Sequence, residues 1–212
     1  MPALTRAAAR RMTEQPVSFS ATDVGIRRVV SQKQDDVWKS RGGVDAYTLM
    51  RKGEVIQQSP QVDHCLEIQL VEFALADACV NLYGGGCRLA STQGDVARAC
   101  EWFSKHMNES KTNLNVTTSR VNQKKRGPFT ALLNRLQQVK TKDAGYTLRN
   151  ISLEQLARQG RARELLLDGT WCRIEKQVCI SYDSLHDMSD GNVVGEETLN
   201  RLHCVLENAG CF

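Results

Sequence analysis

The sequence lacks any long run of apolar residues. No stretch approaches the ~18–20 residues that a helix needs to cross a bilayer, so we expect no transmembrane span and no membrane partner. The segment MPALTRAAARRM at the start lacks the continuous apolar core of a secretory signal, but it is rich in arginine and free of acids. An unstructured basic arm and a mitochondrial presequence both fit it. We therefore expect an intracellular protein of the nucleus or cytoplasm, with the mitochondrion as the alternative.

Closely spaced cysteine pairs are also absent. The chain has eight cysteines, and none of them lies within four residues of another. Structural zinc sites draw paired ligands from tight turns of two to four residues, so the spacing does not favour a zinc module. Without an export signal the expected compartment is reducing, and free thiols packed as small apolar side chains are the favoured interpretation.

Acidic residues are missing from one long window, residues 111–142. The window carries eight basic residues within a chain whose net charge is only +4, so the remainder of the protein is acidic overall. The basic residues are Lys111, Arg120, Lys124, Lys125, Arg126, Arg135, Lys140 and Lys142. A solvated helix face is the alternative, but such faces usually mix both signs of charge. The window therefore favours a polyanionic partner, and nucleic acid in particular.

The composition is that of a folded protein of one domain. At 212 residues, with 41% hydrophobic and 25% charged residues, the chain is long enough to bury a core. We divide it into a basic arm at residues 1–20, a core at 21–145, and a C-terminal α/β supporting region of the same domain at 146–212.

Hydrophobic periodicity predicts the elements of the core. Apolar residues at helical spacing indicate helices at about 67–82 and 91–107, and the segment 112–118 is extended. Short strands at 47–50 and 54–56 are expected to form a hairpin. One helical turn after Ser119 is expected to break at Gly127, with a new helix beginning at Pro128.

The C-terminal third contains three further predicted elements. Ser152 and Gln155 fit a capping box that opens a helix through about Leu166. The alternation in TWCRIEKQVCISYD, residues 170–183, favours a strand or hairpin. A final helix at 196–210 is expected to end at Gly210.

One short segment concentrates residues suited to chemistry. Asp63 and His64 are adjacent at the predicted end of a strand, just before the helix that begins near Glu67. An Asp-His pair alone is weak evidence, since a lone histidine near a core is more often structural. Further along, inside the basic window, lie the pair Asn113-Leu114 and then Asn122, two residues before Lys124.

This order of residues resembles the HNH, or ββα-metal, nuclease superfamily. The family combines an Asp-His pair that ends one strand, an Asn-Leu pair that enters a second strand, and an Asn or His near the start of a helix. The resemblance implies an α+β fold: a ββα-metal core with additional flanking helices. The segment 67–109 would be a helical insertion between the two motif strands.

The resemblance also implies roles for individual residues. His64 would act as the general base, because the imidazole pKa lies near working pH, and Asn113 would orient its ring. Asp63 and Asn122 would hold Mg²⁺, or Mn²⁺, through oxygen atoms. Glu67 would be a supporting hydrogen-bond partner or a further ligand; the alternative is an acid favoured by the helix dipole.

The expected activity is therefore metal-dependent hydrolysis of phosphodiester bonds by an HNH-like endonuclease, with DNA favoured over RNA. Five basic residues are expected to contact the phosphates, namely Lys111, Arg120, Lys124, Lys125 and Arg126. The alternative is a nucleic-acid-binding protein on the same fold whose catalysis has lapsed. A cysteine-held interaction module without a role in nucleic-acid binding is the third interpretation.

Overall fold

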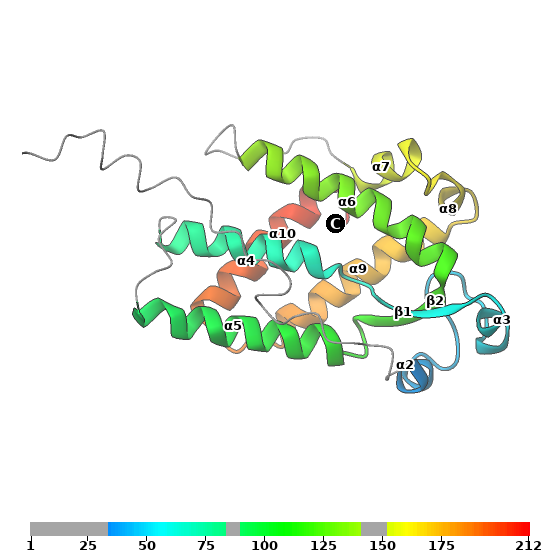
Figure 1. Cartoon of the computed structure of the whole chain (residues 1–212), viewed down its shortest axis with the longest axis horizontal. Helices are drawn as coiled ribbons and strands as arrows, with labels where there is room; N and C mark the ends of the chain where they lie inside the picture. Colours follow the sequence, from blue (N-terminus) through cyan, green and yellow to red (C-terminus); the bar gives the residue numbers. More distant parts are fainter. Residues whose placement is uncertain (1–33, 84–89, 141–151) are drawn as a thin grey trace, which may run out of the picture.

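A computed structural model of the chain describes residues 34–83, 90–140 and 152–212, which form a helical assembly with one small sheet (Figure 1). The predicted arm at 1–20 and the predicted helix stop in YGGGC lie outside these residues. No helix of the described part is both long and apolar enough to span a membrane.

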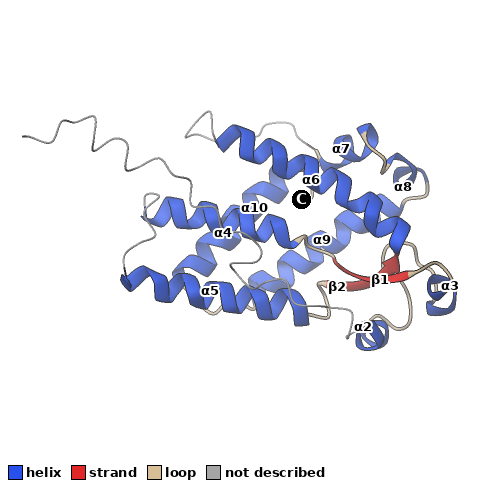
Figure 2. Ribbon diagram, in the orientation of Figure 1, coloured by secondary structure: helices blue, strands red, loops and turns tan. Residues whose placement is uncertain are grey.

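The sheet has two antiparallel strands that are far apart in the sequence. β1 (Pro60–His64) pairs with β2 (Leu114–Thr118), so that His64 lies opposite Leu114 and Asp63 opposite Asn115. Between the strands the chain forms two long helices, α4 (Ile68–Tyr83) and α5 (Ala90–Glu109). Figure 2 shows the sheet at one end of the helical body. The expected combination of helices with a small antiparallel sheet is confirmed, and helices do fill the segment between the strands.

The helix that follows β2 is continuous. α6 runs from Ser119 to Lys140, so the predicted break at Gly127 is wrong. Gly127 is exposed, and Pro128 removes the N–H that would bond to the carbonyl of Lys124 and crowds that carbonyl with its ring. Burial of an apolar stripe along the helix outweighs this loss, because residues on both sides of Pro128 pack into the same core. The stripe includes Val121, Phe129, Leu132 and Leu136.

Two short helices precede the sheet. They are α2 (Gln34–Ser40) and α3 (Lys52–Ile56), and α3 replaces the hairpin predicted for residues 47–56. The buried carboxylate of Asp45 explains the difference. It accepts hydrogen bonds from the backbone N–H of Tyr47 at 2.9 Å and the hydroxyl of Thr48 at 2.6 Å, which together hold this segment in a turn.

The C-terminal region is helical in its described residues, which corrects the predicted α/β region. It contains α7 (Leu153–Gln159), α8 (Arg163–Leu167), α9 (Thr170–Asp187) and α10 (Val193–Asn208). Ser152 caps α7 as predicted by accepting from the N–H of Gln155 at 3.3 Å. The helix expected through Leu166 is divided at Gly160 into α7 and α8.

α9 replaces the strand or hairpin predicted at 170–183. Its buried residues Trp171, Ile174 and Val178 follow helical spacing, and they complete one face of the main core. The final helix was predicted correctly: α10 ends two residues before Gly210, whose φ of 76° suits glycine. α10 packs along α4, and α6 closes the other side of the body (Figure 1).

Candidate functional site

The side chain of Asp63 points from β1 toward α6. Successive residues of a strand point to opposite faces, so Gln61 and Asp63 share the face that α6 covers. Asp63 is 6% exposed. Its Oδ2 accepts a hydrogen bond from the hydroxyl of Tyr47 at 2.9 Å and another from Nζ of Lys125 at 2.7 Å. Both partners of this carboxylate are therefore buried protein groups.

Lys125 is the centre of the site. Its side chain is fully buried, and its ammonium lies 2.7 Å from Asp63 Oδ2 and 2.9 Å from Glu67 Oε1. The backbone carbonyl of His64 is the third partner of the ammonium and accepts a hydrogen bond from Nζ. The rings of Tyr47 and Phe129 each lie with their centroids 5.6 Å from Nζ, within the range of cation–π attraction.

Asp63, Glu67 and Lys125 form what we call the buried ion triad. Burial alone lowers the pKa of Lys125, but the negative charges of Asp63 and Glu67 outweigh it, and the net shift is upward. Burial raises the pKa of Glu67, and the positive charge of Lys125 opposes that change. Burial, followed by the charge of Asp63, raises the pKa of Tyr47 well above its ordinary value. Lys125 is thus held as a cation, and Tyr47 as a neutral hydrogen-bond donor.

The predicted metal ligands do not fit a divalent cation in this arrangement. A cation beside Asp63 would meet the positive charge of Lys125 at hydrogen-bond distance, and because both side chains are buried the repulsion would be weakly screened. Asn122, the second predicted ligand, donates its amide N–H to Gln61 Oε1 at 3.0 Å, which does not involve its oxygen, so the misfit with a metal lies at Asp63. Within the described ranges, no three His, Cys, Asp or Glu side chains are grouped so as to hold a metal ion. Glu67, the predicted supporting residue, is a partner of Lys125 instead.

His64 lies on the other side of β1. Its ring, which is partly exposed, has Nε2 3.3 Å from Oδ1 of Asn108 in α5. β1 continues through His64, so strand alternation separates the imidazole from the face that carries Asp63. The predicted base and the predicted metal ligand are therefore adjacent in sequence but point to different neighbours.

Asn113 does not have the predicted orienting position. It is fully buried, and its Oδ1 accepts from the backbone N–H of Leu66 at 2.8 Å. Its Nδ2 donates to the carbonyl of Met107 at 3.0 Å. Asn113 thus ties the end of α5 to the turn after β1, and the amide beside His64 is that of Asn108.

The five predicted phosphate contacts occupy different environments. Arg120 and Lys124 are on the outer side of α6 and both pair with Glu164 of α8. Lys111 and Arg126 are exposed. Lys125 is fully buried in the triad, so its predicted contact with phosphate is wrong for this structure.

Continuity of α6 explains the position of Lys125. Val121, Lys125, Phe129, Leu132 and Leu136 recur at spacings of three and four residues, and all five are buried. This stripe would have placed Lys125 in the core had the helix not been expected to break at Gly127. Tyr47 and Asn108 were also missed, and for them the sequence offers no spacing signal because their contacts join distant segments.

Comparisons with known proteins add no relative. Neither models of protein families, nor curated proteins, nor solved structures give a match to this chain.

Proposed function

We propose that this protein binds nucleic acid through the outer side of α6 and the adjoining α8, and that it does not cleave phosphodiester bonds with a metal ion at Asp63. This is the alternative function of lapsed catalysis on an HNH-like unit. The observation that carries it is the fully buried ammonium of Lys125, 2.7 Å from Asp63 Oδ2. A protein cation there balances the charge that a metal would otherwise balance.

The order of elements supports an HNH-like unit. β1 ends at His64, β2 begins at Leu114, and α6 follows β2 without a connecting loop, as in a ββα arrangement. Asn122 lies in the first turns of α6 and bonds to Gln61 of β1. One motif residue, Asn122, therefore connects the helix to β1, while the buried ion triad supplies the charge balance.

The outer side of α6 supports a polyanionic partner. Arg120 and Lys124 share one acid, Glu164, and Arg161 and Arg163 precede that acid by three residues and one residue. These four cations and one acid, which we call the α6–α8 basic face, carry a net charge of +3. The pKa of Lys124 is lowered first by desolvation and then by the charge of Arg120. A bound phosphate would relieve this repulsion, and Arg161 and Arg163 are exposed.

The metal-dependent endonuclease remains the second candidate. Two observations favour it: the ββα order of elements and the partly exposed imidazole of His64 at the end of β1. It would require Lys125 to move away from Asp63, because Oδ2 of Asp63 cannot bind the ammonium and a metal ion at the same time.

One paired assay separates the two candidates. Fluorescently labelled single-stranded DNA, duplex DNA and RNA are titrated with the protein in EDTA and in Mg²⁺ or Mn²⁺, and each sample is then analysed on a denaturing gel. The proposal predicts binding of intact nucleic acid that weakens with salt and is indifferent to EDTA. Cleavage that requires the metal and disappears in His64→Ala would establish the endonuclease, and no binding of any probe would refute both.

A further inference from the structure

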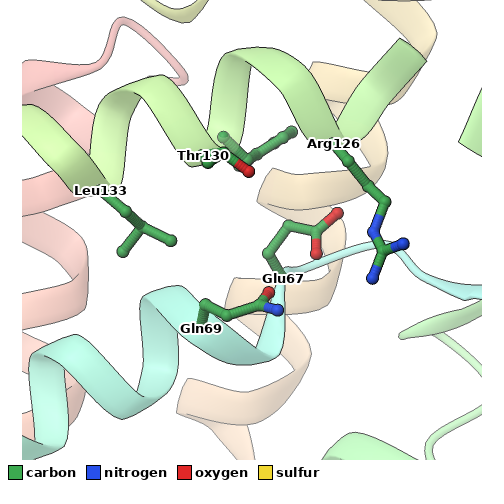
Figure 3. A pocket seen from close by; sticks show the side chains of 6 residues that line it. Glu67, Gln69, Arg126, Thr130 and Leu133 are labelled. Carbon is green, nitrogen blue, oxygen red and sulfur yellow. The ribbon is translucent and has the colours of Figure 1, made fainter. Parts of the chain in front are cut away.

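A pocket lies between the start of α4 and the middle of α6, next to the buried ion triad. It has a volume of about 300 Å³ and is lined by Glu67, Gln69, Arg126, Phe129, Thr130 and Leu133. Figure 3 shows Glu67, Gln69 and Arg126 gathered at one end, with Leu133 at the other. Glu67 joins this pocket to the triad through its contact with Lys125.

The size of the pocket limits the ligand. A volume of about 300 Å³ is at the lower end for small-molecule sites, so one planar ring system with its substituents would fill it. The lining combines the apolar side chains of Phe129 and Leu133 with hydrogen-bonding groups. The amide of Gln69 and the hydroxyl of Thr130 can each both donate and accept, as the edge of a nucleobase requires.

The charges of the pocket argue against two other ligands. A purely apolar molecule would have to cover the carboxylate of Glu67 and the guanidinium of Arg126 without hydrogen bonds to them. A metal cation would face the positive charges of both Arg126 and Lys125. An uncharged ring with N–H donors for the Glu67 carboxylate and an anionic group for the Arg126 guanidinium avoids both costs.

Arg126 has the position of a phosphate-binding residue. It is exposed at the edge of the pocket, and its positive charge is close enough to Glu67 to oppose the rise that burial causes in the pKa of that carboxyl. Guanidinium groups bind phosphate with two parallel hydrogen bonds, and Arg126 belongs to the stretch of sequence that contains no acidic residue.

We infer that this pocket receives one unstacked nucleotide of a bound nucleic acid, with the base between α4 and α6 and the phosphate on Arg126. The inference rests on the proposed function and adds the site that contacts a base. The α6–α8 basic face would hold neighbouring phosphates, and the pocket would admit a base only from a single strand or a locally opened duplex.

The test uses two pocket variants with matched controls on the same helix. Thr130→Trp fills the mouth of the pocket from an exposed position, and its control is Gln137→Trp, also exposed on α6 but outside the pocket. Arg126→Gln removes the phosphate-binding group, and its control is Arg135→Gln, which removes the same charge elsewhere on α6. Circular dichroism and thermal unfolding verify that each variant is folded.

Calorimetric titration with the nucleoside 5′-monophosphates, with inorganic phosphate as the reference, measures occupancy of the pocket. At least one nucleotide should bind more tightly than phosphate, and Thr130→Trp should weaken it by roughly tenfold, the effect expected for losing one well-bound base. Gln137→Trp should leave that affinity as in the wild type. Arg126→Gln should weaken it more than Arg135→Gln does.

A second titration, with labelled single-stranded oligonucleotides, separates this inference from the proposed function. An oligonucleotide with abasic positions should bind more weakly than the intact one, and Thr130→Trp should remove that difference. If oligonucleotides bind but nucleotides bind no better than phosphate and abasic positions have no effect, the pocket inference is wrong and the proposed function stands. If no oligonucleotide binds, the proposed function fails, and the inference about bound nucleic acid fails with it.

Discussion

The lysines on the inner and outer sides of α6 are in opposite environments. On the inner side, Lys125 is fully buried between two carboxylates and contributes to the fold. On the outer side, the adjacent Lys124 shares Glu164 with Arg120 at the surface. A buried cation keeps its ion-pair partner, whereas a cation at the surface can exchange its partner for a phosphate. The basic window therefore contains both a buried structural charge and surface cations, which we propose as part of the binding surface.

Removal of the inner cation should have the largest effect. Lys125→Met leaves Asp63 and Glu67 buried without compensation, so the free energy of unfolding should fall by ~3–5 kcal/mol. Urea denaturation measures the change. The control, Lys124→Met, should cost far less because its ion pair is at the surface. Equal losses in the two variants would show that the two sides of α6 do not differ as described.

Removal of one inner carboxylate should cost less. In Asp63→Asn, Lys125 keeps Glu67 and the carbonyl of His64, so we expect a loss of ~1.5–3 kcal/mol, typical of a hydrogen bond to a charged group. The same denaturation experiment measures it. A loss as large as that of Lys125→Met would mean that Glu67 does not share the charge of the triad.

Changes on the outer side should affect binding and leave stability nearly unchanged. Arg161→Gln combined with Arg163→Gln should reduce the slope of log affinity against log salt by about 2, if each arginine contacts one phosphate. Fluorescence anisotropy over a range of salt concentrations measures the slope. The control is Lys105→Gln, an exposed residue of α5. This helix lies at the opposite end of the body from α8 (Figure 1). An unchanged slope in the double variant would remove α8 from the binding surface.

The smallest effect concerns alkaline pH. The pKa of Tyr47 is raised above 10.0 and that of Lys125 is raised above 10.5, so both groups keep their protons in the folded state beyond these values. The unfolded chain releases the same protons earlier, and stability is therefore lost as pH rises above 10.0. Tyr47→Phe removes one of the two groups.

Urea denaturation at neutral pH and above pH 10.0 should consequently show a shallower alkaline loss for Tyr47→Phe than for the wild type. At neutral pH the variant should be less stable by ~1.5 kcal/mol, since Asp63 loses one hydrogen bond. Parallel stability profiles for the two proteins would show that ionisation of Tyr47 does not contribute to the alkaline loss of stability.

The sequence predicted the elements in which apolar spacing is unambiguous. The helices at 67–82 and 91–107 and the extended segment before Ser119 correspond to α4, α5 and β2. α9 was mistaken for a strand because the alternation in TWCRIEKQVC competes with the helical spacing of Trp171, Ile174 and Val178. Packing against the core decides between strand and helix here, and the order of residues along the chain does not reveal that packing.

The sequence identified several residues of the candidate site but not the contacts between them. Asp63, Glu67 and Lys125 do come together, but the pairing of Lys125 with both acids depends on the phase of α6 relative to β1. The expected break at Gly127 concealed that phase. The positions of His64 and Asn113 depend on contacts with α5, a helix whose packing the motif does not specify.

The central claim is that Lys125 provides the positive charge at Asp63. Titration of the metal-free wild-type protein with Mn²⁺, followed by electron paramagnetic resonance of the free ion, tests it most directly, with Asp63→Asn as the comparison. The account predicts no stoichiometric Mn²⁺ site in the wild type and identical titrations for the two proteins. One tightly bound Mn²⁺ per chain that is lost in Asp63→Asn would contradict it and restore the metal-dependent endonuclease.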